Sequence, residues 1–518
     1  MAKELLTAAI DSVGFLGLNT QESGVNADIK YARQADNCVI DKFGRLGSRK
    51  GWLTRTASVD TIAGDNIGID LTGVASFVDI NGVNNFVSWS ADTFYKGVLD
   101  LTTLTLTTTD TLLTGNWQAV SLNDREYFFQ QGYKPLYYTN ESTTDEFKSI
   151  DQHAAYLGTA PDANCVLSAY GRLWAANTST NKTTVYFTDV LDGVAWSGGT
   201  SGSLDISSVL TNGTDEIIAL GAHNGYLIIF CKRHIIIYGD ADNFVSSIST
   251  ATLTLIEVIA GVGCIARDSV QNTGSDIIFL SETGVQSLNR TVQEKSQPIR
   301  DISKNIKDDI IQAIEAETVS KIKSVWSPRN SFYLLSFPTS SIIYCFNSQE
   351  VLQDGSYRVT KWAGLRHKGL LDYSDTLYIA QIDGVAEYFG YTDNGSSYRM
   401  VYFTNPFDLG IPNVIKIAKR IASTVVGATG QNFVMKIGFD YNTQYRSFPY
   451  QLSSGTIYEY NIGEYNIAEY SGGLLIEQIR APAAGAGAVL QVGFEAEIDG
   501  APLSLQKIST YVKQGKVL

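Results

Sequence analysis

The chain has 518 residues, of which 44% are hydrophobic, 11% aromatic and only 18% charged. Its formal net charge of −14 argues against a reader of nucleic acid, because DNA affinity depends on Lys and Arg side chains that neutralise phosphates. An acidic surface would let DNA slide past without sticking, and it would equally keep a Tyr-rich protein in solution. At this length two or three domains are expected, unless one repeat architecture absorbs most of the chain.

Cysteine and histidine spacing offers no metal or redox site. The five cysteines lie far apart, with an odd total and no C-x-x-C pair, so we expect reduced, buried thiols. The four histidines show neither H-x-x-x-H nor H-E-x-x-H spacing, so no metal and no other cofactor is expected. Residues 1–10 lack a charged segment followed by a long apolar core, so no signal peptide is expected, and no stretch approaches the roughly 18 apolar residues of a membrane span. The sequence predicts a protein made in a cytoplasm, without stable membrane insertion.

Three short motifs open the chain, at residues 14–20 (GFLGLNT), 36–40 (DNCVI) and 44–52 (GRLGSRKGW). They predict a Gly-hinged extended strand, a second strand that begins at an Asn, and a basic turn. The motifs resemble the start of tail tubular or nozzle proteins, and of related tail hub proteins, of short-tailed bacteriophages. In that family the first propeller blade opens with a G-G-x-N motif that contains two adjacent glycines. An Asn and a turn of the pattern G-x-x-x-R-[RK]-G follow it. Here Gly14 and Gly17 replace the usual adjacent glycines, which leaves nozzle and compact hub both open.

After Trp52 one unit recurs, made of an apolar strand, a tight polar turn and a second alternating strand. In the first unit Asn81-Gly82 separates Phe77–Ile80 from Asn85–Trp89, and Asn-Gly between alternating strands is a strong hairpin signal. The units recur at intervals of very roughly 40 to 60 residues, which is typical of propeller blades. We count about seven, with six or eight left open by the irregular register. The units cover residues 77–97, 117–138, 165–187, 217–239, 269–288, 322–346 and 369–388.

Two regions depart from this pattern. Ile302, Ile306, Ile310, Ile311 and Ile314 recur at three- and four-residue steps, which predicts one short amphipathic helix between Asp301 and Lys323 that bridges blades or docks a partner. From Thr392 the repeating unit gives way to alternating strands, a Tyr-rich run (residues 458–470) and an Ala/Gly-rich stretch (residues 481–488), which predicts a separate small β-sandwich. We therefore expect an all-β chain: an N-terminal arm that completes the propeller (1–52), a β-propeller (53–391) and a C-terminal β-sandwich-like domain (392–518).

An enzyme is not expected. Residues 188–196 (TDVLDGVAW) resemble the Asp-box turns of sialidase propellers only distantly, because their spacing differs. Ser, Cys and His form no nucleophile motif, and Gly485-Ala486-Gly487 lacks the surroundings of a dinucleotide loop.

The phage resemblance implies a structural protein of the virion. It implies about six copies in a ring, assembled in the bacterial host cytoplasm, which contacts head–tail adaptor or portal-side proteins and tail fibre, spike or needle proteins. Double-stranded viral DNA would pass through the ring during genome ejection without specific binding. A carbohydrate-binding propeller that acts as a receptor-binding module is the alternative.

Subunit interfaces are expected at the N-terminal arm with its basic turn and at the C-terminal sandwich with its Tyr-rich run, because a cyclic ring needs two different complementary faces. The Tyr-rich run could equally pack on its own sheet as an edge strand. The candidate interface residues are Arg45, Arg49, Lys50, Trp52, Tyr458, Tyr460, Tyr465 and Tyr470.

Overall fold

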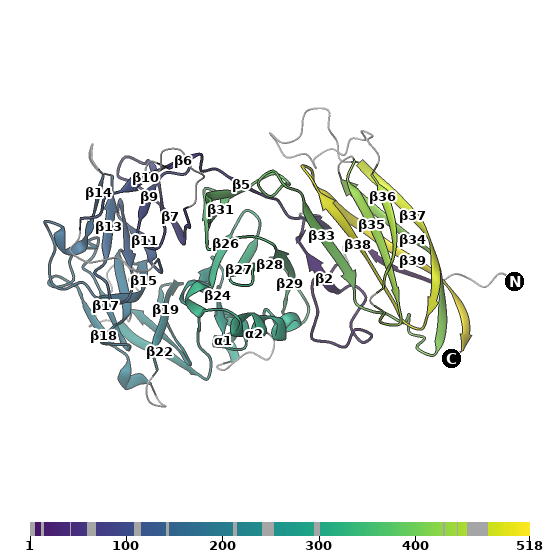
Figure 1. Cartoon of the computed structure of the whole chain (residues 1–518). Coiled ribbons are helices and arrows are strands. Elements are labelled where there is room, and N and C mark those ends of the chain that lie inside the picture. Colours follow the sequence, from purple (N-terminus) through teal and green to yellow (C-terminus); the bar gives the residue numbers. More distant parts are fainter. Residues whose placement is uncertain are drawn as a thin grey trace.

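The computed structural model describes residues 6–11, 15–41, 43–59, 69–107, 115–140, 145–210, 215–240, 253–294, 301–427, 430–442, 444–452 and 475–517. Within these ranges the chain forms two parts, a ring of seven small sheets and a sandwich of two sheets with long strands (Figure 1). The first and last described strands, Leu6–Asp11 and Leu503–Val517, pair with each other in the sandwich (Figure 1). The predicted all-β fold class, a propeller with a C-terminal sandwich, is confirmed.

The ring is a β-propeller whose blades are antiparallel sheets of consecutive strands. Blade 1 comprises β7 (Gly73–Val78), β8 (Asn84–Trp89), β9 (Phe94–Lys96) and β10 (Asp100–Leu104), with β6 (Ser58–Val59) beside β10. Blade 2 comprises β11 (Gln118–Leu122), β12 (Arg125–Phe129), β13 (Leu136–Thr139) and β14 (Glu146–Ser149), and blade 3 comprises β15 (Ala163–Ala169), β16 (Arg172–Thr178), β17 (Thr184–Phe187) and β18 (Gly202–Asp205). Blade 4 comprises β19 (Ile217–His223), β20 (Tyr226–Cys231), β21 (His234–Asp240) and β22 (Leu253–Ala260). Blade 5 comprises β23 (Gln271–Asn272), β24 (Ile277–Ser281) and β25 (Gly284–Ser287). Blade 6 comprises β26 (Lys323–Ser327), β27 (Phe332–Phe337), β28 (Ile342–Val351) and β29 (Tyr357–Ala363). Blade 7 comprises β30 (Gly369–Tyr373), β31 (Thr376–Gln381) and β32 (Gly384–Tyr388).

The blades close into a complete ring. Their first strands contact one another in the order β7, β11, β15, β19, β23, β26 and β30, and β30 returns to β7. Blade 7 gains its outer strand from the N-terminal arm, because β5 (Trp52–Thr54) pairs antiparallel with β32. A strand from the start of the chain thus binds the last blade, and the ring contains seven blades.

Local turn chemistry explains why each blade forms. Tyr170-Gly171 and Asn224-Gly225 occupy two-residue turns in which both residues have positive φ, the conformation that matches the twist of a tight hairpin. In blade 1 the Asp79 carboxylate accepts hydrogen bonds from the backbone N–H groups of Asn81 and Val83, both at 2.9 Å. These turns specify strand pairing between sequence neighbours, so the blades are built from local signals.

The sandwich is built from much longer strands. One sheet comprises β37 (Leu475–Gly487), β34 (Val414–Gly427) and β39 (Leu503–Val517), with β1 (Leu6–Asp11), β4 (Leu46–Ser48) and β3 (Cys38–Ile40) beyond β39. The facing sheet comprises β2 (Ala32–Asp36), β33 (Tyr398–Thr404), β38 (Leu490–Ile498), β35 (Asn432–Phe439) and β36 (Arg446–Gln451).

The arm belongs mainly to the sandwich, which corrects the expectation that residues 1–52 complete the propeller. β5 joins blade 7, whereas β1, β2 and β4 pair with C-terminal strands. β2 also pairs with the last strand of blade 6 at Asp36↔Lys361, so one continuous sheet runs from the propeller into the sandwich. A sequence pattern predicts that a strand exists but not which edge it will join.

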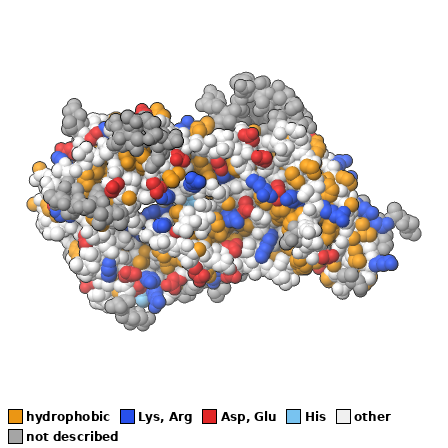
Figure 2. All heavy atoms as spheres, viewed as in Figure 1, with side chains coloured by type: hydrophobic (Ala, Val, Ile, Leu, Met, Phe, Trp, Pro, Cys, Tyr) orange, Lys and Arg blue, Asp and Glu red, His pale blue; other side chains and the backbone are white. Residues whose placement is uncertain are grey.

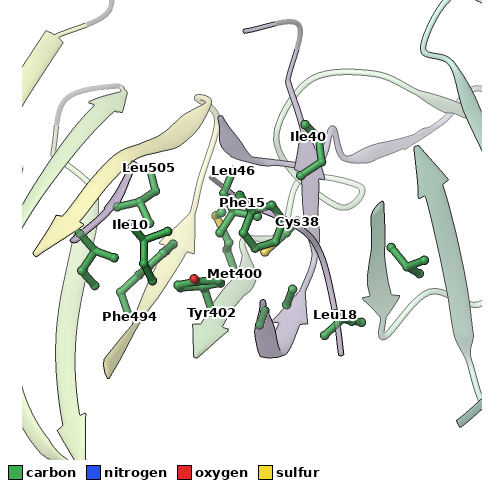
Figure 3. Close-up of a cluster of buried hydrophobic side chains, with 14 of the residues drawn as sticks. Ile10, Phe15, Leu18, Cys38, Ile40, Leu46, Met400, Tyr402, Phe494 and Leu505 are labelled. Carbon is green, nitrogen blue, oxygen red and sulfur yellow. The ribbon is translucent and has the colours of Figure 1, made fainter. Parts of the chain in front are cut away.

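Apolar side chains of the arm lie inside the sandwich core (Figure 3). Burying one large apolar side chain contributes about 1.5–3 kcal/mol to folding, so the arm is an integral part of this core. The cluster shown contains Ile10, Phe15, Leu18, Cys38, Ile40 and Leu46 from the arm, and Met400, Tyr402, Phe494 and Leu505 from the C-terminal strands.

Two short helices follow blade 5, where one was expected. α1 (Leu288–Glu294) was not predicted, and α2 (Lys307–Glu315) is shorter than the predicted span. The backbone is extended at Thr318 and Ile322, which ends the helical run. The isoleucine pattern is nevertheless used as expected, since Ile306 and Ile310 are fully buried against the core.

Candidate functional site

The first candidate site is the junction where arm, propeller and sandwich meet. Asn37 lies between β2 and β3 with a φ of +56°, a conformation that Asn tolerates better than most residues. Its side-chain Nδ2 donates to the Arg399 carbonyl at 2.8 Å, and its backbone N–H donates to the Lys361 carbonyl at 2.7 Å. Its Oδ1 accepts from the Ala363 N–H at 3.1 Å. One side chain of the arm therefore binds both blade 6 and the sandwich.

Arg49 is the charged centre of this junction and is fully buried. Its guanidinium makes two parallel hydrogen bonds to the Asp393 carboxylate, at 2.8 and 2.6 Å, and its Nε donates to Asn37 Oδ1 at 3.0 Å. The Tyr398 ring lies 4.1 Å from the guanidinium carbon, a cation–π distance. We call Asn37, Arg49, Asp393 and Tyr398 the junction cluster. Bidentate pairing gives the cluster directional specificity as well as charge neutralisation.

The end of the basic turn continues into the propeller. Gly51 donates its N–H to the Gly390 carbonyl at 2.9 Å, and a Cβ at this position would lie 1.9 Å from the Thr392 carbonyl oxygen. Only glycine permits this close approach of two backbones. Trp52 then packs at 5.1 Å from the Tyr388 ring and 6.4 Å from the Trp362 ring. The motif residues thus connect the domains within one chain.

These positions alter the expected subunit interface. Arg49 and Trp52 are buried inside the chain, and Arg45 is nearly buried by its 2.8 Å pair with Asp41, so none of the three is offered to a neighbouring subunit. Lys50 is half-buried beside Tyr388, whose hydroxyl accepts the Lys50 N–H at 3.0 Å. The other four candidates, Tyr458, Tyr460, Tyr465 and Tyr470, lie outside the described residues.

The second candidate site is the central channel of the propeller. Arg267 donates to the Asn164 carbonyl at 2.8 Å, to Asn116 Oδ1 at 3.2 Å and to the Asp268 carboxylate at 2.8 Å. Lys323, at the start of β26, donates to the same Asp268 carboxylate at 2.5 Å. We call Asn116, Asn164, Arg267, Asp268 and Lys323 the channel cluster, which joins blades 2, 3, 5 and 6.

The channel cluster separates two cavities. A cavity of about 560 Å³ at one mouth is lined by inter-strand turns and by α2, and a cavity of about 510 Å³ is lined by the first strands of the blades. Arg267 and Asp268 line both. The charged side chains therefore lie across the channel between the two cavities.

Electrostatics explains why Asp268 stays ionised in this place. Burial by itself would raise the pKa of Asp268, but the charges of Arg267 and Lys323 outweigh it and hold that pKa well below its usual range. Glu126 on β12 is the opposite case, because burial raises the pKa of its carboxyl to about 8 and the hydrogen bond from the Ser121 hydroxyl offsets this only in part. Glu126 is therefore neutral near pH 7.

Comparison with known proteins adds little to this geometry. No family model and no curated protein matches the chain. The chain is similar to a solved structure described as "YCF48 bound to D1 peptide", with 8% identity, a TM-score of 0.35, and coverage of 64% of this chain and 97% of that one. A likeness of this size carries no argument about function. The propeller assignment follows from the strand pairing itself.

Several site residues carried no usable signal in the sequence. Asp393 lies 344 positions from Arg49, and nothing local marks it as a partner. Arg267 and Asp268 are adjacent charges in the apolar stretch 258–270, which could have indicated a buried pair. Lys323 lies 55 positions further along and could not have been assigned to it.

The remaining expectations concern thiols, metals and membranes. All five cysteines are buried free thiols, as predicted, and burial raises the pKa of Cys264 to about 11. Over the described ranges, no three His, Cys, Asp or Glu side chains gather as a metal site. No helix in the described part of the chain is long and apolar enough to cross a membrane.

Proposed function

We propose that this chain is a structural protein of a virion, a subunit of the tail hub or nozzle ring of a short-tailed bacteriophage. The observation that carries the proposal is that Asn37, Arg49 and Gly51, which belong to the motifs behind the family resemblance, bind propeller and sandwich together. The continuous sheet through β2 adds to this connection. The propeller and the sandwich are joined by strands as well as by side chains, which suits a ring subunit that must bear mechanical load.

In this proposal about six copies surround an axial channel that passes the genome outward, and the protein has no enzymatic activity. DNA would travel between subunits and not through a propeller, because the channel cluster lies across the propeller's own channel. Adaptor or portal-side proteins would bind one end of the ring, and fibre, spike or needle proteins the other. The protein would be assembled in the host cytoplasm and reside in the tail.

The tryptophans favour this proposal over the carbohydrate-binding alternative. A sugar platform needs exposed aromatic rings, yet six of the seven tryptophans are buried and the seventh, Trp326, is half-buried. The buried six are Trp52, Trp89, Trp117, Trp174, Trp196 and Trp362.

Negative-stain imaging and mass photometry of the purified full chain over a range of concentrations test the proposal. We expect rings with a central hole, and only weak, salt-sensitive binding to double-stranded DNA. A protein that remains monomeric at the highest concentration, or that binds DNA tightly at physiological salt, contradicts it.

A further inference from the structure

Charge is divided unequally between the two parts of the molecule. Residues 53–391, the propeller region, hold 22 Lys and Arg against 37 Asp and Glu, whereas the rest of the chain holds 17 and 16. The propeller region therefore has a net charge of −15 (22 − 37) and the rest of the chain a net charge of +1 (17 − 16), so the net negative charge of the protein lies in the propeller region. Figure 2 shows blue and orange side chains gathered at the sandwich end of the molecule.

Strand register places four cations on the outer face of the β37–β34–β39 sheet. Arg420 pairs with Tyr511 and Pro482, and the next outward row is Ala422 with Ser509 and Arg480. The rows on either side carry Lys507 and Lys513, opposite Thr424 and Ile417. We call Arg420, Arg480, Lys507 and Lys513 the outer basic face.

The residues that alternate with these rows on β34, β37 and β39 point inward, toward the facing sheet. Ile421, Val425, Ile479, Ile508 and Val512 are almost fully buried between the two sheets, which confirms that the rows above face outward. Arg480, Lys507 and Lys513 are exposed, and the Arg420 guanidinium lies 4.2 Å from the centre of the Tyr511 ring. None of the described outward side chains on these three strands is acidic, and in the same sheet Asp11 of β1 stands opposite Lys507 in the strand register.

Apolar and small residues lie between the cations. Ile417, Tyr511, Pro482 and Ala484 share the outward rows with them, and Ile476 at the end of β37 is 42% exposed. A surface that mixes flat apolar area with separated cations suits an acidic protein partner. A nucleic-acid groove would need a denser run of phosphate contacts.

We propose that the outer basic face binds the acidic propeller of a second copy of this chain. The contact is heterologous, since one copy offers its sandwich and the next its propeller, and repetition of such a contact closes a ring. The complementary surface is the propeller mouth beside α2, where the exposed Glu282 and Glu315 line one cavity and the exposed Asp308 lies on the same helix as Glu315. The inference rests on the proposed ring and assigns the surfaces that form it.

Charge reversal tests the contact. In the full chain, Arg480→Glu with Lys513→Glu should lower the association constant at least about tenfold, whereas the same charge change on the propeller, Lys182→Glu with Lys232→Glu, should not weaken it. Raising the salt concentration should dissociate the wild-type assembly, because charge pairing at an exposed interface is screened. Mass photometry and sedimentation velocity measure both effects, and circular dichroism melting checks that the variants fold.

The outcomes separate this inference from the proposed function. Wild-type rings that persist unchanged in the Arg480→Glu/Lys513→Glu variant overturn the inference and leave the ring proposal standing. A wild-type chain that never assembles overturns the ring proposal, and the inference with it. Tight binding of a DNA duplex that the same variant loses would assign the outer basic face to nucleic acid instead, and would also contradict the inference.

Discussion

The propeller and the sandwich reach the same all-β composition by different routes. Each blade pairs strands that follow one another in the chain, through turns such as Asn224-Gly225. In the sandwich, the 15-residue β39 pairs with β34 and with β1, which comes from the opposite end of the sequence. Short-range pairing can be predicted from turn chemistry, whereas long-range pairing depends on which edges remain open after the local elements form.

Deletion of the N-terminal arm tests this difference between local and long-range strand pairing. Deleting residues 1–52 removes β1 to β4 from the sandwich and Trp52, the first residue of β5, from blade 7, so we expect the sandwich to fail and the protein to aggregate. This is the largest effect predicted here, because it exposes core residues and leaves strand edges unpaired. Melting temperature and particle size measure it. Deleting residues 1–11 is the control and should cost less, since of the described strands it removes only β1. A soluble protein of unchanged stability after the larger deletion would show that the arm is dispensable.

The junction cluster tests how strongly the two parts are coupled. Asp393→Asn leaves Arg49 buried without its countercharge, and we expect a loss of about 3 kcal/mol in unfolding free energy. Urea unfolding monitored by tryptophan fluorescence measures this loss. The exposed pair between Lys368 and Asp70 supplies the matched control, and Asp70→Asn should cost less than about 1 kcal/mol. Equal effects of the two substitutions would mean that the junction contributes no more than a surface pair.

Substitutions at two glycines distinguish the stability cost of a steric clash from the cost of backbone strain. Gly51→Ala places a Cβ against the Thr392 carbonyl and should cost about 2 kcal/mol or more, because two backbones must move apart. Gly82 has a φ of +74° with open space around it, so Gly82→Ala should cost only about 1 kcal/mol of strain. Thermal melts of both variants measure the difference. If Gly51→Ala costs no more than Gly82→Ala, the domains are less closely apposed than described.

Glu126 gives the propeller its own pH dependence. Its folded pKa of about 8 lies above the unfolded value near 4.5, so the unfolded chain loses its proton first as pH rises. Glu126 therefore lowers stability progressively from about pH 4.5 to about pH 8. Glu126→Gln cannot ionise, and we expect it to stabilise the protein by about 2 kcal/mol at pH 8 and hardly at all at pH 4.5. Melting curves at both pH values measure this, with the exposed Glu282→Gln as the control; a constant difference across pH would contradict the expected neutral carboxyl.

Much of the candidate site could not be predicted from the sequence, because the partners of the motif residues lie far away in the chain. Asn37, Arg49 and Gly51 stood out as motif residues, but their partners Asp393 and Thr392 are more than 300 positions away. Arg49 and Lys50 suggested a basic surface, and the fold placed the Arg49 charge in the interior instead. A charged residue in a turn has the same sequence appearance whether it faces solvent or a buried carboxylate.

By itself, the sequence indicated about seven repeating units, the hairpin turns within them, the buried thiols and a change of architecture after residue 391. Those features depend on residues close together in the chain, where positive φ, alternation and helical periodicity act directly. Only the tertiary structure decided that β1 to β4 join the sandwich, that β2 carries one sheet from blade 6 into it, and that Arg267, Asp268 and Lys323 meet across the channel. Edge pairing and burial of charge are decided by which surfaces remain available once the local units have formed, and no local pattern encodes that choice.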